Sequence, residues 1–82
     1  MLTDDAVKAN LAENVNRLLA DRGWSQKLLA EKTGDPVMTI SRLCRGENVV
    51  GSGTISRVAE AFDVSIDRLV GMPPEKISRR SA

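Results

Sequence analysis

The sequence predicts an all-α fold, a compact bundle of about five short helices that contains a helix-turn-helix. Apolar residues recur at helical spacing in several segments, and glycine or proline residues separate these segments. Strand patterns are nearly absent, because the adjacent β-branched pair Val49-Val50 is too short to form a strand. The length of 82 residues fits one domain with a modest core.

The first helix is predicted to begin near Thr3 and to end at Arg22-Gly23. Asp4 and Asp5 then lie at its N-terminus, where the positive end of the helix dipole favours carboxylates. Apolar residues spaced three or four apart form a stripe that requires a partner in the core. The stripe consists of Val7, Leu11, Val15, Leu18 and Leu19.

Residues 25–46 have the features of two short helices joined by a tight turn. Ser25 is a suitable N-cap for the first helix, and Gly34 lies where a left-handed residue would end it. Asp35 is then predicted to cap the second helix, with Pro36 at its first helical position, where the missing N–H costs nothing. Such a pair is a helix-turn-helix, whose second helix enters the major groove of DNA. We therefore predict that a helix over residues 36–45 contacts DNA bases.

A helical wheel of residues 36–45 separates an inner side from an outer side. The inner side holds Pro36, Ile40, Leu43 and Cys44. The outer side holds Met38, Ser41, Arg42 and Arg45, with Val37 and Thr39 at its edges. Arginine can pair with guanine O6 and N7, and apolar side chains can contact the methyl group of thymine. The predicted base-contacting residues are Val37, Met38, Thr39, Ser41 and Arg42. In the alternative interpretation, the two arginines are solvated surface charges and Met38 is a single exposed apolar residue.

Phosphate contacts are expected on both sides of this helix, at the starts of the preceding and following helices. Helix N-termini offer N–H groups without intrahelical partners and the positive end of a dipole. The predicted phosphate contacts are Ser25, Gln26, Lys27, Arg45, Asn48, Ser52 and Thr54. Because the loop at residues 47–53 has no basic residue, we expect about two to four cationic contacts per subunit and a shallow salt dependence.

Two further helices are predicted after the glycine-flanked turn at residues 51–53. The fourth helix begins around residues 52–54, and its inner face holds Ile55, Val58, Ala59 and Phe62. Ser65 caps a short fifth helix, in which Ile66, Leu69 and Val70 are expected to face the core. Pro73-Pro74 ends the fold, so residues 1–72 form the predicted DNA-binding domain and residues 73–82 a flexible basic tail.

Composition argues against an enzyme. The chain has no histidine and one cysteine, Cys44, which excludes an intramolecular disulfide and leaves no ligands for zinc and no histidine for acid–base catalysis. We therefore expect no catalytic residue, no metal and no cofactor.

The absence of a signal peptide or an apolar spanning segment predicts a cytoplasmic protein without a membrane partner. The net charge of +1 argues against a generally basic surface. Residues 25–46 hold four cations against two carboxylates, and this local balance favours a directed DNA-binding face.

Residues 11–71 resemble the lambda-repressor/Cro-type (XRE-like) helix-turn-helix regulators. The resemblance depends on Gln26, Ala30, Gly34, Ile40 and Leu43, followed by matching segments at residues 54–62 and 64–71. By this resemblance, base contacts map onto Val37, Met38 and Arg42, with Ser41 adjacent, and Gln26 binds the DNA backbone. The chain departs from the family at Asp35 and Pro36, so we expect the second helix to start one residue early.

The resemblance has a further consequence for the core. The family often buries an arginine from its first helix against a glutamate near the end of the recognition helix, and the matching positions here are Leu19 and Cys44. Replacing both members of a buried ion pair by apolar groups is often neutral or stabilising. We therefore predict that the side chains of Leu19 and Cys44 touch.

The function expected from the motif and the resemblance is a sequence-specific transcriptional regulator, predicted to be a repressor. It would bind double-stranded DNA with a two-fold operator as a homodimer, through the last helix and the region Val70–Met72. The alternative is an antitoxin-type protein-binding module that neutralises a protein partner and also represses its own operon.

Overall fold

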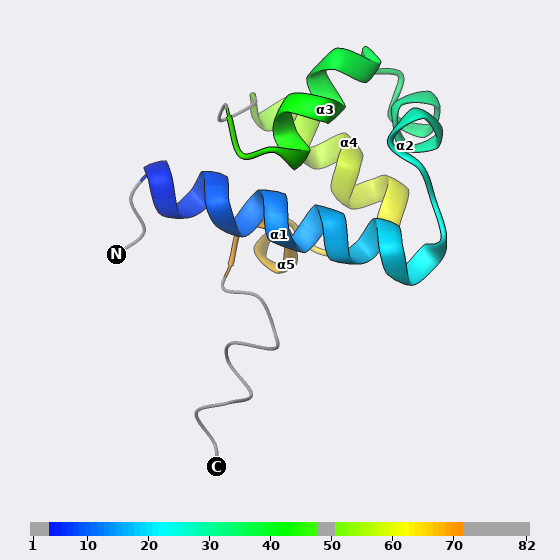
Figure 1. Cartoon of the computed structure of the whole chain (residues 1–82). Helices are drawn as coiled ribbons and strands as arrows, with labels where there is room; N and C mark the ends of the chain where they lie inside the picture. The colour runs from blue at the N-terminus through cyan, green and yellow to red at the C-terminus, as the bar shows by residue number, and fades with distance from the viewer. Residues whose placement is uncertain (1–3, 48–50, 72–82) are drawn as a thin grey trace.

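The computed structural model describes residues 4–47 and 51–71, which fold into five α-helices (Figure 1). The helices are α1 (Asp4–Arg22), α2 (Gln26–Thr33), α3 (Val37–Cys44), α4 (Ser52–Phe62) and α5 (Ile66–Val70). These residues contain no strand, so the predicted all-α fold is confirmed. The long α1 packs against α3 and α5, α2 packs against α3 and α4, and α4 packs against α5. None of the described helices has the length and apolar character needed to cross a bilayer.

The hydrophobic core draws on all five helices. Its buried apolar residues are Leu11, Val15, Leu18, Leu19, Leu29, Ala30, Ile40, Leu43, Cys44, Val58, Ala59, Phe62 and Leu69. The predicted stripe of the first helix and the inner face of the fourth are therefore confirmed, with Val7 and Ile55 partly buried. Because α1 supplies core residues from Leu11 to Leu19 and packs against α3 and α5, it serves as the support for these two helices.

The predicted end of the first helix at Arg22-Gly23 is confirmed, since α1 ends at Arg22 and Gly23 has a positive φ of 68°. Its start at Asp4 follows Thr3, the predicted first residue, which lies outside the described residues. Asn48, Met72, the tail 73–82 and the side chain of Ser52 also lie outside them.

Three asparagines of α1 hold the ends of other helices, which the apolar pattern of the sequence did not predict. The buried Asn14 donates from Nδ2 to the carbonyl oxygens of Leu69, at 2.7 Å, and Gly71, at 2.9 Å. Asn10 donates to Val70 O at 3.2 Å, and Asn16 donates to Cys44 O at 2.8 Å. The last carbonyls of a helix lack intrahelical partners, so these amides fix where α5 and α3 end against α1.

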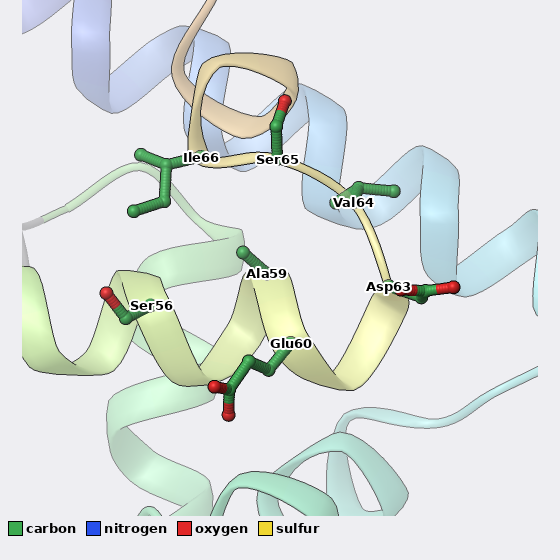
Figure 2. Close-up of a pocket in the computed structure, with 7 residues that line it drawn as sticks. All are labelled: Ser56, Ala59, Glu60, Asp63, Val64, Ser65 and Ile66. Atoms are coloured by element: carbon green, nitrogen blue, oxygen red, sulfur yellow. The ribbon is translucent and has the colours of Figure 1, made fainter.

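The prediction that Ile66 faces the core is wrong, because this side chain is 46% exposed while Leu69 is buried. Ile66 is the first residue of the short α5, and its side chain points toward α4 without joining the core cluster (Figure 2). There it lines an open groove of about 370 Å³ between α4 and α5. The other lining residues are Ser56, Ala59, Glu60, Asp63, Val64 and Ser65. The N-cap prediction for this helix is confirmed, since the Ser65 hydroxyl accepts from Arg68 N at 3.1 Å.

Leu19 and Cys44 belong to the same buried cluster. Direct contact between their side chains stays a prediction. Burial raises the pKa of the Cys44 thiol to about 11, so the thiol stays protonated near neutral pH. Cys44 therefore acts as a small apolar side chain in the core.

Candidate nucleic-acid interface

The first helix of the helix-turn-helix has the predicted caps. Ser25 is the N-cap of α2, and its Oγ accepts from Leu28 N at 3.0 Å. Gly34 adopts the left-handed conformation, with φ of 79°, and its N–H donates to Ala30 O at 2.8 Å. A left-handed residue at this point turns the chain sharply after α2, and α3 then packs across α2.

The start of α3 differs from the sequence expectation. Asp35 does not cap α3, and Pro36 is not its first helical residue. Pro36 is the N-cap with an extended ψ of 144°, its carbonyl accepts from Thr39 N and Ile40 N, and α3 begins at Val37. The helix therefore does not start early, because the Asp35 carboxylate binds an arginine of α4 instead of the first turn of α3.

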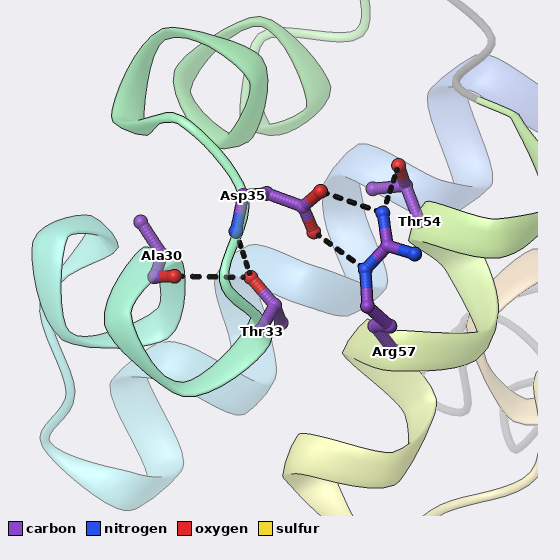
Figure 3. A network of polar contacts seen from close by, with 5 residues as sticks. All are labelled: Ala30, Thr33, Asp35, Thr54 and Arg57. Atoms are coloured by element: carbon purple, nitrogen blue, oxygen red, sulfur yellow. Dashed lines mark hydrogen bonds and ion pairs between the residues drawn. The ribbon is translucent and has the colours of Figure 1, made fainter.

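Asp35 and Arg57 form a two-bond ion pair between the turn and α4 (Figure 3). Arg57 Nη2 lies 2.7 Å from Asp35 Oδ1, and Arg57 Nε lies 3.3 Å from Oδ2. The backbone N–H of Asp35 donates to Thr33 Oγ1, which in turn donates to Ala30 O. The hydrogen bond from Arg57 is the main reason why the pKa of Asp35 lies below its ordinary value. The turn is thereby bound to α2 and to α4.

The inner and outer sides of α3 agree with the helical wheel except at Pro36, which was predicted on the inner side and is exposed as the N-cap before the helix. Ile40, Leu43 and Cys44 are buried, whereas Val37 is 48% and Met38 59% exposed. Arg42 is exposed, and Thr39 and Ser41 are partly exposed. The face predicted to contact bases is thus accessible, while the contacts themselves stay predictions.

The C-terminus of α3 places two arginines near one glutamate. Arg45 Nε lies 2.6 Å from Glu47 Oε2, and Arg45 Nη1 donates to Ser41 Oγ at 2.9 Å. The hydrogen bond from Arg45 lowers the pKa of Glu47, and the charge of Arg42 acts in the same direction. Arg45, predicted to bind phosphate, is therefore already paired with a carboxylate, and Ser41 is held from the same guanidinium.

The predicted phosphate contacts other than Arg45 divide between two helix starts. Ser25, Gln26 and Lys27 lie together at the start of α2, where the Ser25 hydroxyl, although it accepts from Leu28 N, still has a proton to donate. At the start of α4, Thr54 Oγ1 accepts from Arg57 Nη2 at 3.2 Å. The two other predicted contacts on this side, Asn48 and the Ser52 side chain, are not among the described residues.

An aromatic and cationic cluster beside α2, built on Trp24 and Phe62, was missed from the sequence. Their rings stack with centroids 5.1 Å apart. Lys32 Nζ lies 4.7 Å and the Arg22 guanidinium 5.5 Å from the centroid of the Trp24 ring. These are distances at which cations are attracted to aromatic faces. Lys32 therefore contacts an aromatic ring within the fold, and Arg45 is paired with Glu47.

Comparisons with known proteins agree with this geometry. The sequence profile of HTH_3, a helix-turn-helix family, matches residues 15–69, which is more than half of the chain. A comparison with curated protein sequences found no significant match.

Two crystal structures have the same fold. The hypothetical transcription factor NHTF from Neisseria superposes with a TM-score of 0.81 at 25% identity, over 96% of this chain and 91% of that one. An HTH_3 family transcriptional regulator from Vibrio cholerae gives a TM-score of 0.78 at 25% identity over 94% of this chain, which spans 43% of the regulator's length. The family expected from the sequence is confirmed: this chain belongs to the HTH_3 helix-turn-helix family.

Proposed function

We propose that this protein is a sequence-specific DNA-binding transcriptional regulator that binds the major groove with α3. The observation that carries the proposal is the exposed outer face of α3, where Val37 and Met38 are about half exposed and Arg42 is open to solvent. The buried side of the same helix is fixed by Ile40 and Leu43. A helix held this firmly on one side presents its other side in a defined orientation.

Each residue of this face has a chemical partner in the major groove. Arg42 can donate two parallel hydrogen bonds to guanine, and such a pair contributes about 1–3 kcal/mol of discrimination. Val37, Met38 and the Thr39 methyl group can contact thymine methyl groups. Ser41 can donate or accept next to Arg42. The first residues of α3 lie deepest in the groove if the helix docks as other recognition helices do.

The start of α2 supplies the phosphate contacts best supported by the geometry. Gln26 and Lys27 occupy its first turn, where N–H groups lack intrahelical partners. With Lys32 at Trp24 and Arg45 at Glu47, we infer that few cations bind the DNA backbone. At about two to four contacts per subunit, the slope of log K against log[salt] is roughly −4 to −7 for a dimer. A measured slope near −10 or steeper contradicts this inference.

The experiment that tests the function is a binding selection from random duplex DNA. Wild-type protein should enrich a palindromic site, and Arg42→Ala should lose preference at one base position in each half-site. Lys27→Ala is the matched control, because removing a phosphate-binding side chain from α2 weakens binding uniformly and leaves the selected sequence unchanged. Enrichment of no sequence by the wild type contradicts the proposal, as does an unchanged site for Arg42→Ala.

We further propose that the regulator is a homodimer that contacts itself through α5 and the region Val70–Met72, and that it acts as a repressor. The exposed Ile66 beside the groove between α4 and α5 supports this interface, since it leaves an apolar side chain on the last helix without a core partner. Two half-sites about 34 Å apart would then match the two recognition helices.

Ile66→Glu tests the dimer. Because the side chain is half exposed, the variant should fold normally but lose dimerisation in light scattering and bind a full operator no more tightly than a half-site. Ala9→Glu adds the same charge at an exposed position of α1 and serves as the control. If both variants dimerise to the same extent as the wild type, the proposed interface is contradicted.

The same groove favours a second candidate function, a protein-binding module of the antitoxin type that also regulates its own operon. Glu60 and Asp63 line the groove next to Ile66 and Val64, so a partner with an apolar and a basic side chain would fit it. Co-purification of a stoichiometric partner that is absent with Ile66→Glu supports this candidate. Retention of the partner by that variant contradicts it.

A further inference from the structure

The turn that follows α3 fixes the place of one carboxylate, that of Glu47. Gly46, with φ of 71°, donates from its N–H to Leu43 O, and Glu47 N donates to Arg42 O, each at 3.1 Å. This is the double hydrogen bond of a Schellman motif, in which glycine supplies the left-handed residue. The motif fixes the backbone of Glu47 against the last turn of α3.

From this position, the Glu47 carboxylate forms an ion pair with the guanidinium of Arg45. Glu47 Oε2 accepts from Arg45 Nε at 2.6 Å, and Oε1 accepts from Arg45 Nη2 at 3.4 Å. A third donor of the same group, Nη1, is bound to Ser41 Oγ. The two charged side chains are each about half exposed, at 52% and 48%. The arginine is thus accessible to DNA, but three of its donors are already used.

An exposed ion pair of this kind contributes little to the stability of a fold. Its larger effect is expected on the binding of DNA phosphates to Arg45. A DNA phosphate that approached Arg45 would compete with Glu47 for the same donors and would be repelled by its charge. The carboxylate also lies close enough to Arg42 for that charge to lower the pKa of Glu47. Glu47 therefore opposes phosphate binding at Arg45, which directly follows α3.

We propose that Glu47 is a specificity-determining residue, which holds Arg45 against Ser41 and so limits sequence-independent binding to the DNA backbone. The inference rests on the proposed function, because it concerns the same DNA-binding face. Phosphate contacts supply most of the non-specific affinity, whereas base contacts supply sequence preference. A carboxylate that occupies one phosphate-binding arginine therefore raises the ratio of specific to non-specific affinity.

The test compares Glu47→Gln with wild type for binding to the selected operator and to a random-sequence duplex, over a series of salt concentrations. Glutamine keeps the size of the side chain and removes its charge. Random-sequence DNA should bind about three- to tenfold more tightly, and its salt slope should steepen by roughly 0.9 per added phosphate contact per subunit. Operator affinity should rise less, so that the specificity ratio falls.

Two controls separate this local effect from a general change of charge. Glu31→Gln removes the same charge from an exposed position of α2 and should leave the specificity ratio unchanged. In an Arg45→Ala background, Glu47→Gln should lose most of its effect, because the proposed competition acts through Arg45. Circular dichroism of each variant verifies that the helices are intact.

The outcomes distinguish the inference from the proposed function. If the wild-type protein binds DNA and Glu47→Gln binds random-sequence DNA no more tightly than Glu31→Gln does, the inference is overturned and the proposed function stands. The same holds if the effect of Glu47→Gln is undiminished in the Arg45→Ala background. A wild-type protein that binds no duplex overturns the proposed function and this inference with it.

Discussion

Asp35 and Arg57 join the turn of the helix-turn-helix to α4 across 22 positions of sequence. The Asp35 side chain is only 9% exposed, whereas Arg57 is 47% exposed. The carboxylate is therefore the shielded member of the pair, and it depends on Arg57 for its charge-assisted hydrogen bonds. Because Asp35 directly precedes the N-cap of α3, the pair anchors the chain to α4 next to the start of α3.

The Asp35–Arg57 pair makes stability depend on pH in the acidic range. Hydrogen bonding to Arg57 holds the pKa of Asp35 below 3.8 in the folded state. The pair therefore stabilises the fold fully above about pH 4, and this contribution is lost as the pH falls through the lowered pKa. Asp35→Asn should unfold at a lower temperature than wild type at pH 7, with the difference shrinking below pH 3.8. Thermal unfolding from pH 7 to pH 2.5 measures this effect.

Arg57→Ala gives the matched comparison for that series, because it leaves the carboxylate in place without its partner. It should be less stable at pH 7 than Asp35→Asn, which has no charge to shield. Destabilisation by Asp35→Asn that is equal at all pH values would show that the ion pair is not the cause.

Gly34 should tolerate asparagine better than alanine. Its φ of 79° lies in the left-handed region, and a Cβ added there would meet no atom within 4 Å. The cost of Gly34→Ala therefore comes from the backbone conformation alone, at about 1–2 kcal/mol of unfolding free energy. Gly34→Asn should cost less, because asparagine adopts this conformation more readily. Urea unfolding of the two variants provides the comparison, and equal losses would contradict the argument.

The sequence was sufficient to predict features that depend on neighbours along the chain. Ser25 and Gly34 as caps of α2 follow from local chemistry, and the burial of Ile40 and Leu43 follows from helical spacing. The exposed face of α3 was also predictable from helical spacing, because it consists of the residues opposite the buried ones.

The features that the sequence did not reveal depend on side-chain pairs that the residue pattern alone does not specify. Asp35 has the chemistry of an N-cap, and only the position of Arg57 on α4 explains why it does not act as one. Glu47 pairs with Arg45 because of the turn that Gly46 makes. An Asp-Pro start signal and a charged loop are compatible with several arrangements, and packing selects one of them.

Cys44 should be protected from thiol reagents in the folded protein. The side chain is buried, and its pKa of about 11 leaves little thiolate at pH 8. We expect a disulfide reagent to react slowly with the native protein and rapidly in denaturing urea, with the native rate following the population of unfolded molecules. Rapid reaction under native conditions would contradict the burial of this residue against α1.

Asn14 should be the polar residue of α1 whose loss destabilises the fold most. Its amide is fully buried and donates to the carbonyls of Leu69 and Gly71, while Oδ1 accepts from Arg68 at 3.5 Å. Asn14→Ala removes the buried amide that donates to both carbonyls, at a cost of about 1–3 kcal/mol. Urea unfolding measures the loss.

Asn16→Ala is the matched control for Asn14→Ala, because it removes the same amide from an exposed position that holds Cys44 O at the end of α3. Water can replace the donor there, so the loss of unfolding free energy should be about 1 kcal/mol or less.

Asn14→Ala and Asn16→Ala should also differ in their effects on dimerisation and DNA binding. Asn14→Ala loosens α5 and should weaken dimerisation, whereas Asn16→Ala loosens the end of α3 and should weaken operator binding by the monomeric Ile66→Glu protein. The reverse pattern would show that these amides do not place the two helices independently.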